Sequence, residues 1–172
     1  MTVQELSFLH NVFTDKLIGF CSGVFDLTHP GHFYFFEQCK KQCGVLFVMV
    51  GGDDCVKKRK GDSRPIINQV GRLYMVKNCK FVDYGFSNLI PEQMSHIWDN
   101  IELVFKYLKP SIYFINEDAF DIEPRIQICD NHKVKLKMMS RDWPSDIGEI
   151  STTKIIDKIT HDSHKNTAPL FV

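Results

Sequence analysis

Short apolar segments alternate with longer amphipathic segments along almost the whole chain, and this alternation constrains the fold more than any single residue. Strand-like segments occur at residues 17–21, 45–50, 80–84, 111–115 and 133–139. Segments with helical spacing occur at residues 2–13, 31–43, 68–78, 91–108, 124–131 and 151–160. Strands that alternate with helices form a parallel sheet with helices on both faces. The sequence therefore predicts an α/β fold with a doubly wound parallel sheet.

Length and charge fit one ordinary domain. A chain of 172 residues can bury a proper hydrophobic core. We expect a single domain over residues 1–160 and a loose tail over residues 161–172. The 21 Lys and Arg residues balance 21 Asp and Glu residues, so the overall charge gives no reason to expect nucleic acid or a membrane surface as a partner. The longest apolar run, residues 45–50, is too short to span a bilayer.

The six cysteines favour a reducing environment. They form no CxxC pair, and most lie beside apolar residues, so we interpret them as free buried thiols rather than zinc ligands. The chain also begins without the pattern of a signal peptide. These features together predict a cytoplasmic protein.

Polar residues gather where three of the predicted strands end. They occur at residues 22–23, 51–54 and 116–118. In an open parallel sheet, ligands bind beyond the carboxyl ends of the strands. Three separate strand ends therefore predict one ligand site.

The segment SGVFDLTHPGH carries the strongest indication of chemistry. A strand runs into Gly23, and Pro30 is a favourable first residue for the helix that follows. The start of a helix attracts phosphate, and His29 and His32 lie three residues apart on it. A metal-binding pair or two surface histidines are the alternatives, but the chain offers no further metal ligands by spacing. We predict that the histidines act on a nucleotide's phosphates and that neighbouring residues bind the nucleotide, namely Ser22, Gly23, Val24, Phe25, Asp26 and Gly31.

This segment resembles the HxGH signature of the nucleotidyltransferase superfamily, which includes cytidylyltransferases and sugar-phosphate adenylyltransferases. The resemblance extends over residues 17–158. It implies a Rossmann-like fold, Mg²⁺ bound with the nucleoside triphosphate, and a homodimer. It also implies that His29 and His32 stabilise the pentacoordinate transition state at the α-phosphorus while pyrophosphate leaves.

A second segment, KKRKGDSRP at residues 57–65, concentrates positive charge just after a strand end. Most charge runs are solvated surface, but this position favours a mobile cationic loop that folds over polyphosphate. The segment resembles the KRxKGxxRP stretch of heptose-phosphate adenylyltransferase domains, with Lys58 in place of arginine.

The same resemblance suggests roles for the charged residues around this segment. Lys57, Lys60 and Arg72 are the candidate catalytic cations. Arg64 and Asp53 are the candidates for binding the acceptor.

A third segment, ISTTKI, begins the last predicted helix. Three hydroxyl side chains at a helix start are typical of a plain cap, and they also form an anion site. The segment resembles the ISTTKI of cytidylyltransferases, which implies triphosphate contacts from Ile150, Ser151, Thr152 and Thr153. Cytidylyltransferases carry Arg-Thr-Glu-Gly just before it. This chain has no arginine there, and Arg141 is the nearest substitute.

A fourth segment follows residues 111–115. Relatives of this superfamily often have Gly-Asp-Asp or Gly-Gly-Asp at this strand end, where it contacts the base or ribose. This chain has Asn116 and Asp118 there without the glycine, and we predict the same contacts from them.

The resemblance implies transfer of a nucleotidyl group from a triphosphate to a phosphorylated small alcohol or sugar, with release of pyrophosphate. ISTTKI favours CTP as the donor, whereas KKRKGDSRP favours ATP and a sugar phosphate; we give CTP a narrow preference. A nucleotide-binding module without turnover is the alternative of another class.

Overall fold

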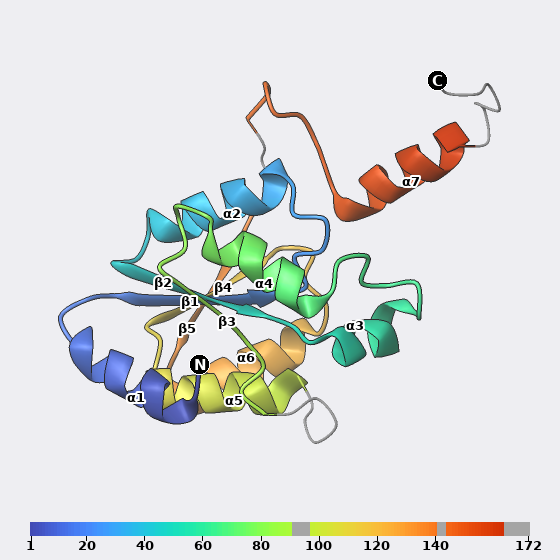
Figure 1. The fold of residues 1–172 in the computed structure, drawn as a ribbon. Helices are drawn as coiled ribbons and strands as arrows, with labels where there is room; N and C mark the ends of the chain where they lie inside the picture. The colour runs from blue at the N-terminus through green and yellow to red at the C-terminus, as the bar shows by residue number, and fades with distance from the viewer. Residues whose placement is uncertain (91–96, 141–143, 164–172) are drawn as a thin grey trace.

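The computed structural model describes residues 1–90, 97–140 and 144–163. Its centre is one sheet of five parallel strands in the order β3-β2-β1-β4-β5 (Figure 1). The strands are β1 (Ile18–Gly23), β2 (Val45–Val50), β3 (Tyr84–Ser87), β4 (Ile112–Asn116) and β5 (Lys135–Met139). This arrangement confirms the predicted α/β fold with a doubly wound parallel sheet.

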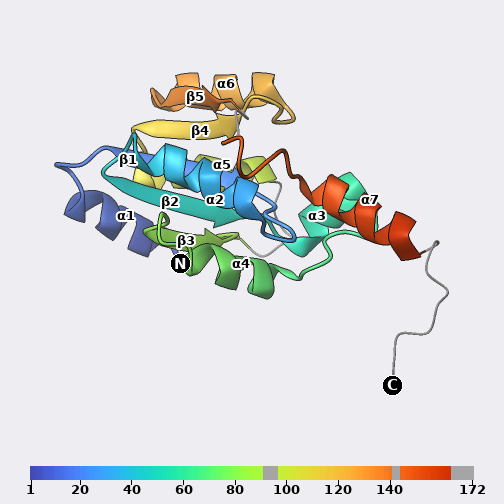
Figure 2. The same ribbon diagram turned by 90° about the horizontal axis from the view of Figure 1, so that it is seen from above.

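Helices cover both faces of the sheet (Figures 1 and 2). One face carries α2 (Pro30–Lys40) and α4 (Gln69–Lys77), and the other carries α1 (Val3–Val12), α5 (Ile97–Leu108) and α6 (Ile122–His132). Two helices lie beyond the carboxyl ends of the strands instead, namely α3 (Asp53–Lys60) and α7 (Thr152–Ser163). None of the helices in the described ranges is long and apolar enough to cross a membrane.

The strands alternate their side chains between two hydrophobic cores, as the pleat of a strand requires. On β1, Phe20 packs with α1 and α5, while Cys21 packs with α2 and α4. β2 is buried along its whole length because it lies between β1 and β3 and is covered on both faces. All six cysteines are free thiols, as predicted; four are buried, whereas Cys43 and Cys55 are half-buried.

The strand order reverses at β1, which is bordered by β2 on one side and β4 on the other. Gly23 pairs with Val50, so β1 and β2 end side by side. This is the switch point at which open parallel sheets bind ligands. The fold therefore places the SGVFDLTHPGH segment at the position that a ligand site requires.

Two predicted elements differ from the structure. The strand expected at residues 80–84 is found at Tyr84–Ser87, because Val82 N–H closes a turn onto the Cys79 carbonyl and Asp83 accepts a hydrogen bond from Leu46 N–H. The basic segment expected to be a loop is helical up to Lys60. Acidic residues in the first turn of α3 and basic residues in its last turn match the helix dipole, and Gly61 ends the helix at a φ of 87°.

Element ends differ elsewhere by a few residues. The last helix continues to Ser163, beyond the predicted end at residue 160, so the first residues of the expected tail are helical. Of the helix expected at residues 91–108, the structure has Ile97–Leu108, and residues 91–96 lie outside the described residues. Arg141 also lies outside them.

Candidate active site

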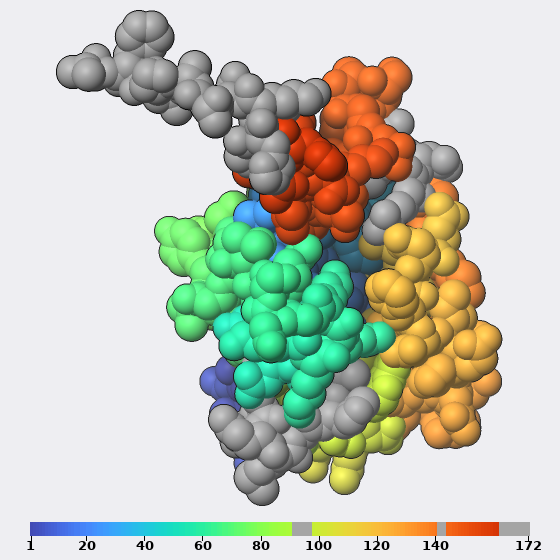
Figure 3. Space-filling view, turned by 90° about the vertical axis from the view of Figure 1, so that its right-hand side faces the viewer, coloured from blue at the N-terminus to red at the C-terminus, as the bar shows by residue number. Residues whose placement is uncertain are grey.

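The predicted site residues meet at the carboxyl edge of the sheet. Figure 3 looks onto this edge and shows a hollow with the β1–α2 segment at its base. The hollow is bordered by α3 and the segment after it, by the segment after β4, and by α7. The four segments that the sequence predicted to carry chemistry therefore surround one space.

The loop between β1 and α2 has a tight backbone. Phe25 and Leu27 have φ angles of 53° and 44°, in the left-handed region that L-residues seldom occupy. A side chain on Gly23 would meet the Phe25 ring 2.8 Å away, so glycine is needed there. Phe25 itself is buried against Phe36 and against the edge of the His32 ring. The strained loop is thus held by packing beneath it.

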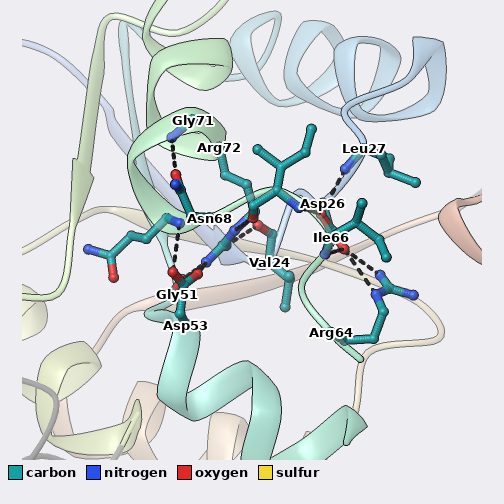
Figure 4. A network of polar contacts seen from close by, with 12 residues as sticks. Val24, Asp26, Leu27, Gly51, Asp53, Arg64, Ile66, Asn68, Gly71 and Arg72 are labelled. Carbon is teal, nitrogen blue, oxygen red and sulfur yellow. Dashed lines mark hydrogen bonds and ion pairs between the residues drawn. The ribbon is translucent and has the colours of Figure 1, made fainter. Parts of the chain in front are cut away.

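Asp26 is the centre of a buried polar network (Figure 4). Its carboxylate accepts hydrogen bonds from the Ile66 and Ile67 N–H groups, both at 2.9 Å, and pairs with the Arg64 guanidinium, also at 2.9 Å. Burial raises the pKa of Asp26, but the backbone donors and Arg64 outweigh it, and the net pKa is lowered. Both oxygens bind protein donors, so the carboxylate organises the loop that follows α3. A direct contact between Asp26 and a nucleotide stays a prediction.

Arg72 forms a second network on α4 beside the first (Figure 4). It has no exposed surface, and its guanidinium donates to the carbonyls of Val24 at 2.5 Å, Gly51 at 2.7 Å and Ile67 at 2.9 Å. It also pairs with Asp53 at 2.7 Å. Arg72 thereby ties together the ends of β1 and β2 and the start of α4. The guanidinium of Arg72, which the sequence predicts as a catalytic cation, thus holds the backbone beneath the site in place.

His29 and His32 lie at the start of α2 with ring centroids 4.0 Å apart. His29 is the N-cap residue, and its Nδ1 accepts from Gly31 N–H at 3.2 Å. The Nδ1 of His32 accepts from His29 N–H at 3.4 Å. Because each Nδ1 is an acceptor, a neutral ring carries its proton on Nε2. In this tautomer the Nε2–H group is the donor of each imidazole; His29 is buried at the helix start and His32 is half-buried.

α3 brings the basic residues to the rim of the site. Lys57 and Lys60 are exposed on its last turns. The pKa of Lys60 is lowered, mainly by partial burial of the ammonium group and next by the nearby positive charge of Arg64. The negative charge of Asp26 acts in the opposite direction. Arg59 pairs with Asp121 at 2.5 Å, which links α3 to the segment before α6 across the site.

α7 joins the site through its first residue. Thr152 Oγ1 donates to the Asp26 carbonyl at 2.9 Å, although the two residues are far apart in the sequence. Ser151 Oγ accepts from Lys154 N–H at 3.2 Å as a helix cap, and Thr153 is exposed. Ile150 precedes these residues and is half-buried. The structure therefore brings ISTTKI beside the loop that carries the histidines.

A shallow pocket lies between α2 and the ends of β4 and β5. Its lining is mostly apolar. The lining residues are Gly31, Tyr34, Phe35, Gln38, Asn116, Met139 and Ser140. Asp118 is exposed and is not part of this lining.

Sequence reasoning missed the α2 residues of this pocket. Tyr34 and Gln38 are separated by one helical turn, and both follow Gly31 on the same side of α2. Their helical spacing from the predicted Gly31 contact was the available signal.

Ser22 has a different environment from the one expected. Its hydroxyl lies 2.8 Å from the Tyr113 hydroxyl on β4, so its side chain turns toward the sheet.

Among the described residues, no group of three or more His, Cys, Asp or Glu side chains could hold a metal ion.

The sheet is parallel, and the paired histidines lie at the helix start beyond its central strand. The family model described as "Cytidylyltransferase-like" matches residues 20–158. The chain therefore belongs to the cytidylyltransferase-like family.

Two curated relatives match most of this chain. The chain is 34% identical over 146 residues to the "Bifunctional protein HldE" of Campylobacter jejuni. The matched region is 84% of this chain but 28% of that protein. The chain is also 34% identical over 142 residues to the "FAD synthase" of Methanobrevibacter ruminantium, which covers 80% of this chain and 88% of that protein. This chain thus corresponds to a minor part of the HldE proteins and to most of the FAD synthase.

Solved structures support the fold. A lipopolysaccharide core biosynthesis protein from Thermoplasma volcanium aligns with a TM-score of 0.57 at 23% identity, over 79% of this chain and 99% of that chain. A pantoate-beta-alanine ligase from Francisella tularensis aligns with a TM-score of 0.60 at 15% identity, over 93% of this chain and 76% of that chain.

Proposed function

We propose that this protein transfers a nucleotidyl group from a nucleoside triphosphate to the phosphate of a small phosphorylated acceptor. The observation that carries the proposal is the convergence on Asp26. Its carboxylate holds the loop after α3, and its carbonyl holds α7. The paired histidines, the basic helix and the ISTTKI helix start are thereby gathered around one hollow.

In the proposed reaction, an acceptor phosphate oxygen attacks the α-phosphorus of the triphosphate. A new P–O bond forms, the bond between the α- and β-phosphates breaks, and pyrophosphate leaves with its electron pair. The acceptor is an anion at neutral pH, so no general base is required. Alignment and neutralisation of charge then supply the catalysis.

Each group has a role that follows from its position. The Nε2–H groups of His29 and His32 donate to the α-phosphate oxygens as charge develops on them. Lys57 and Lys60 balance the charge of the leaving pyrophosphate from the rim. Arg64 and Asp53 are retained as the acceptor-side candidates, and both are already fixed by partners within the protein.

We propose that Mg²⁺ arrives with the triphosphate. Asp26 is the carboxylate nearest the histidines in sequence, and protein donors bind both of its oxygens. Phosphate oxygens and water are ligands that this ion favours. No step of the proposed reaction depends on a protein–metal contact.

ATP is the donor that we now favour, which reverses the narrow preference for CTP. FAD contains an adenylyl group, and a relative named FAD synthase covers most of this chain. The similarity of KKRKGDSRP to heptose-phosphate adenylyltransferase domains points the same way. Asn116 and Asp118, at the end of β4, are retained as the predicted contacts of the base or ribose. CTP is retained as the second candidate because of ISTTKI.

Pyrophosphate release tests the proposal directly. The protein is incubated with Mg²⁺ and each nucleoside triphosphate, together with a panel of phosphorylated sugars, polyols and flavin mononucleotide. We expect release with ATP and one class of acceptor. Release with CTP alone would reverse the donor assignment. If no pair reacts while ATP still raises the unfolding temperature, the protein is a nucleotide-binding module.

A substitution at His32 tests the assigned chemistry. We expect His32→Ala to lower kcat about 100-fold or more, because a donor to the developing charge is lost. The control is His132→Ala at the opposite end of α6, where the imidazole pairs with Glu102 and not with the site. Full turnover by the His32 variant would show that the chemistry is wrongly assigned.

We also propose a cytoplasmic homodimer, on the basis of the free thiols and the family resemblance. Sedimentation velocity at micromolar protein concentration distinguishes a dimer from a monomer.

A further inference from the structure

Arg125 is a buried cation that the proposed chemistry does not use. It lies in the first turns of α6, and only 8% of it is exposed. Its hydrogen-bond partners are both neutral oxygens, the Phe120 carbonyl and the Tyr113 hydroxyl. Its guanidinium also lies over the Trp98 ring, 5.2 Å from the centroid. Within the described part of the chain, no carboxylate pairs with it.

A buried cation without an anionic partner is unfavourable for stability alone. A hydrophobic residue of similar size would fill the same space between α5, α6 and β4 without that penalty. Stability alone therefore does not account for Arg125, and its two directed hydrogen bonds indicate which parts of the chain it holds in place.

One of these bonds leads to the nucleotide loop. Arg125 Nη1 donates to the Tyr113 hydroxyl, and that hydroxyl lies 2.8 Å from Ser22 Oγ at the end of β1. Tyr113 is fully buried, so the three side chains form a chain of contacts beneath the sheet edge. Ser22 is followed directly by Gly23 and the loop that carries the histidines.

The other bond leads to the opposite wall of the site. Arg125 Nε donates to the Phe120 carbonyl at 3.0 Å, in the segment between β4 and α6. The next residue, Asp121, pairs with Arg59 of α3 at 2.5 Å. This segment is therefore held from the inside by Arg125 and from across the site by α3.

We propose that Arg125 is a positioning residue for nucleotidyl transfer. It sets the spacing between the loop after β1 and the segment after β4. Its planar guanidinium donates in two fixed directions, which a flexible side chain with one charged atom cannot reproduce. This inference rests on the proposed function, because the two segments that it aligns are walls of that site.

Four variants separate this role from simple packing. Arg125→Met removes both bonds, and Arg125→Lys keeps the charge without the planar fork. Tyr113→Phe removes only the contact toward Ser22 and keeps the ring. Lys106→Met is the matched control, because Lys106 is an exposed cation beside the Tyr107 ring on α5.

The first measurement is amide hydrogen exchange, which requires no substrate. We expect Arg125→Met to exchange about 10-fold faster than the natural chain in peptides covering residues 22–28 and 117–121. Peptides from α1 and β2 should remain unchanged. Tyr113→Phe should accelerate exchange only in residues 22–28, and it also provides the test if Arg125→Met does not fold. Unchanged exchange in both segments, or equal acceleration everywhere, would overturn the proposal.

The second measurement is turnover with the donor and acceptor found by pyrophosphate release. We expect kcat of Arg125→Met and Arg125→Lys to fall about 10- to 100-fold, while KM for the triphosphate changes by less than about 3-fold. Normal kcat with local exchange changes would overturn the role in transfer. If the natural chain has no turnover with any pair, the proposed function fails, and the exchange result still decides whether Arg125 aligns the two segments.

Discussion

At the scale of single residues, two buried charged groups hold the segments around the site together through hydrogen bonds to the rest of the protein. Asp26 and Arg72 lie side by side beneath the hollow, one holding the loop after α3 and the other holding the strand ends (Figure 4). Charged groups of this kind are stable in a protein interior only when their hydrogen bonds are complete. Their substitution should therefore affect stability as well as activity.

Substitution of Asp26 should change the pH dependence of stability. The folded-state pKa of Asp26 is lowered, so its contribution is fully present above the unfolded pKa of about 3.9 and is lost as pH falls through the folded value. We expect Asp26→Asn to lower the free energy of unfolding at pH 7 by about 3 kcal/mol and to flatten the acid limb of the stability curve. Denaturant unfolding between pH 2.5 and 7 measures both. An acid limb that keeps its slope would contradict this assignment.

Substitution of Arg72 should be more damaging than substitution of a surface arginine. Arg72→Met leaves the buried Gly51 carbonyl and the half-buried Val24 carbonyl without this donor, and we expect a loss of about 3–5 kcal/mol of unfolding free energy. Arg59→Met is the matched control, because its pair with Asp121 is largely exposed and should contribute about 1 kcal/mol or less. Urea denaturation compares the two. Equal losses of unfolding free energy in the two variants would mean that the hydrogen bonds of Arg72 contribute no more stability than one surface ion pair.

At the scale of elements, α3 and α7 differ from the other helices because neither lies on a face of the sheet. α3 is helical although its composition suggests a flexible loop, since its charges match the helix dipole. α7 carries the ISTTKI start, and Thr152 supplies its hydrogen bond to the loop after β1. These two helices border the hollow at the carboxyl edge of the sheet.

The attachment of α7 should depend on the Thr152 hydroxyl. We expect Thr152→Val, which keeps the shape of the side chain, to weaken triphosphate binding about 5- to 10-fold as the Asp26 contact is lost. Thr160→Val is the control, because the Thr160 hydroxyl bonds carbonyls of its own helix, away from the site. Isothermal titration with ATP measures the difference. The prediction is wrong if both variants bind ATP equally well.

At the scale of the whole molecule, the two hydrophobic cores and the site are built from different parts of the chain. The described residues of both cores come from the sheet, from the helices on its faces and from the loops between them, and none comes from α7. The proposed nucleotide site, by contrast, includes the start of α7, which is attached through the Thr152–Asp26 hydrogen bond. Folding and ligand binding should therefore separate experimentally.

Removal of the chain after Ile150 tests this separation. We expect the shortened protein to unfold within about 4 °C of the full chain, because the cores stay intact. Its stabilisation by ATP should be lost, since one wall of the site is missing. Differential scanning fluorimetry with and without ATP measures both effects. A cooperative transition that ATP still shifts normally would show that α7 is not part of the site.

Much of this architecture is readable from local sequence. The strand at Val45–Val50 was predicted with its observed bounds, because a short, wholly apolar run fits a strand covered on both faces. Asn68 and Asn78 flank the observed α4 as its caps, as the predicted helix boundaries indicate. The apolar residues Phe81 and Val82 resemble a strand in the sequence, but in the structure they belong to a turn that closes onto the Cys79 carbonyl. β3 therefore begins later than the sequence predicts.

Local sequence patterns are enough to predict the parallel α/β fold, a ligand site at the strand ends, and the segments around that site. Periodicity and helix-start residues are local properties, so they are visible in one dimension. The folded chain, by contrast, is needed to see that Asp26 joins three segments, that Arg72 faces the protein interior, and that Arg125 contacts both sides of the proposed site. These assignments depend on hydrogen bonds between residues distant in the chain, and burial makes each bond directional and necessary.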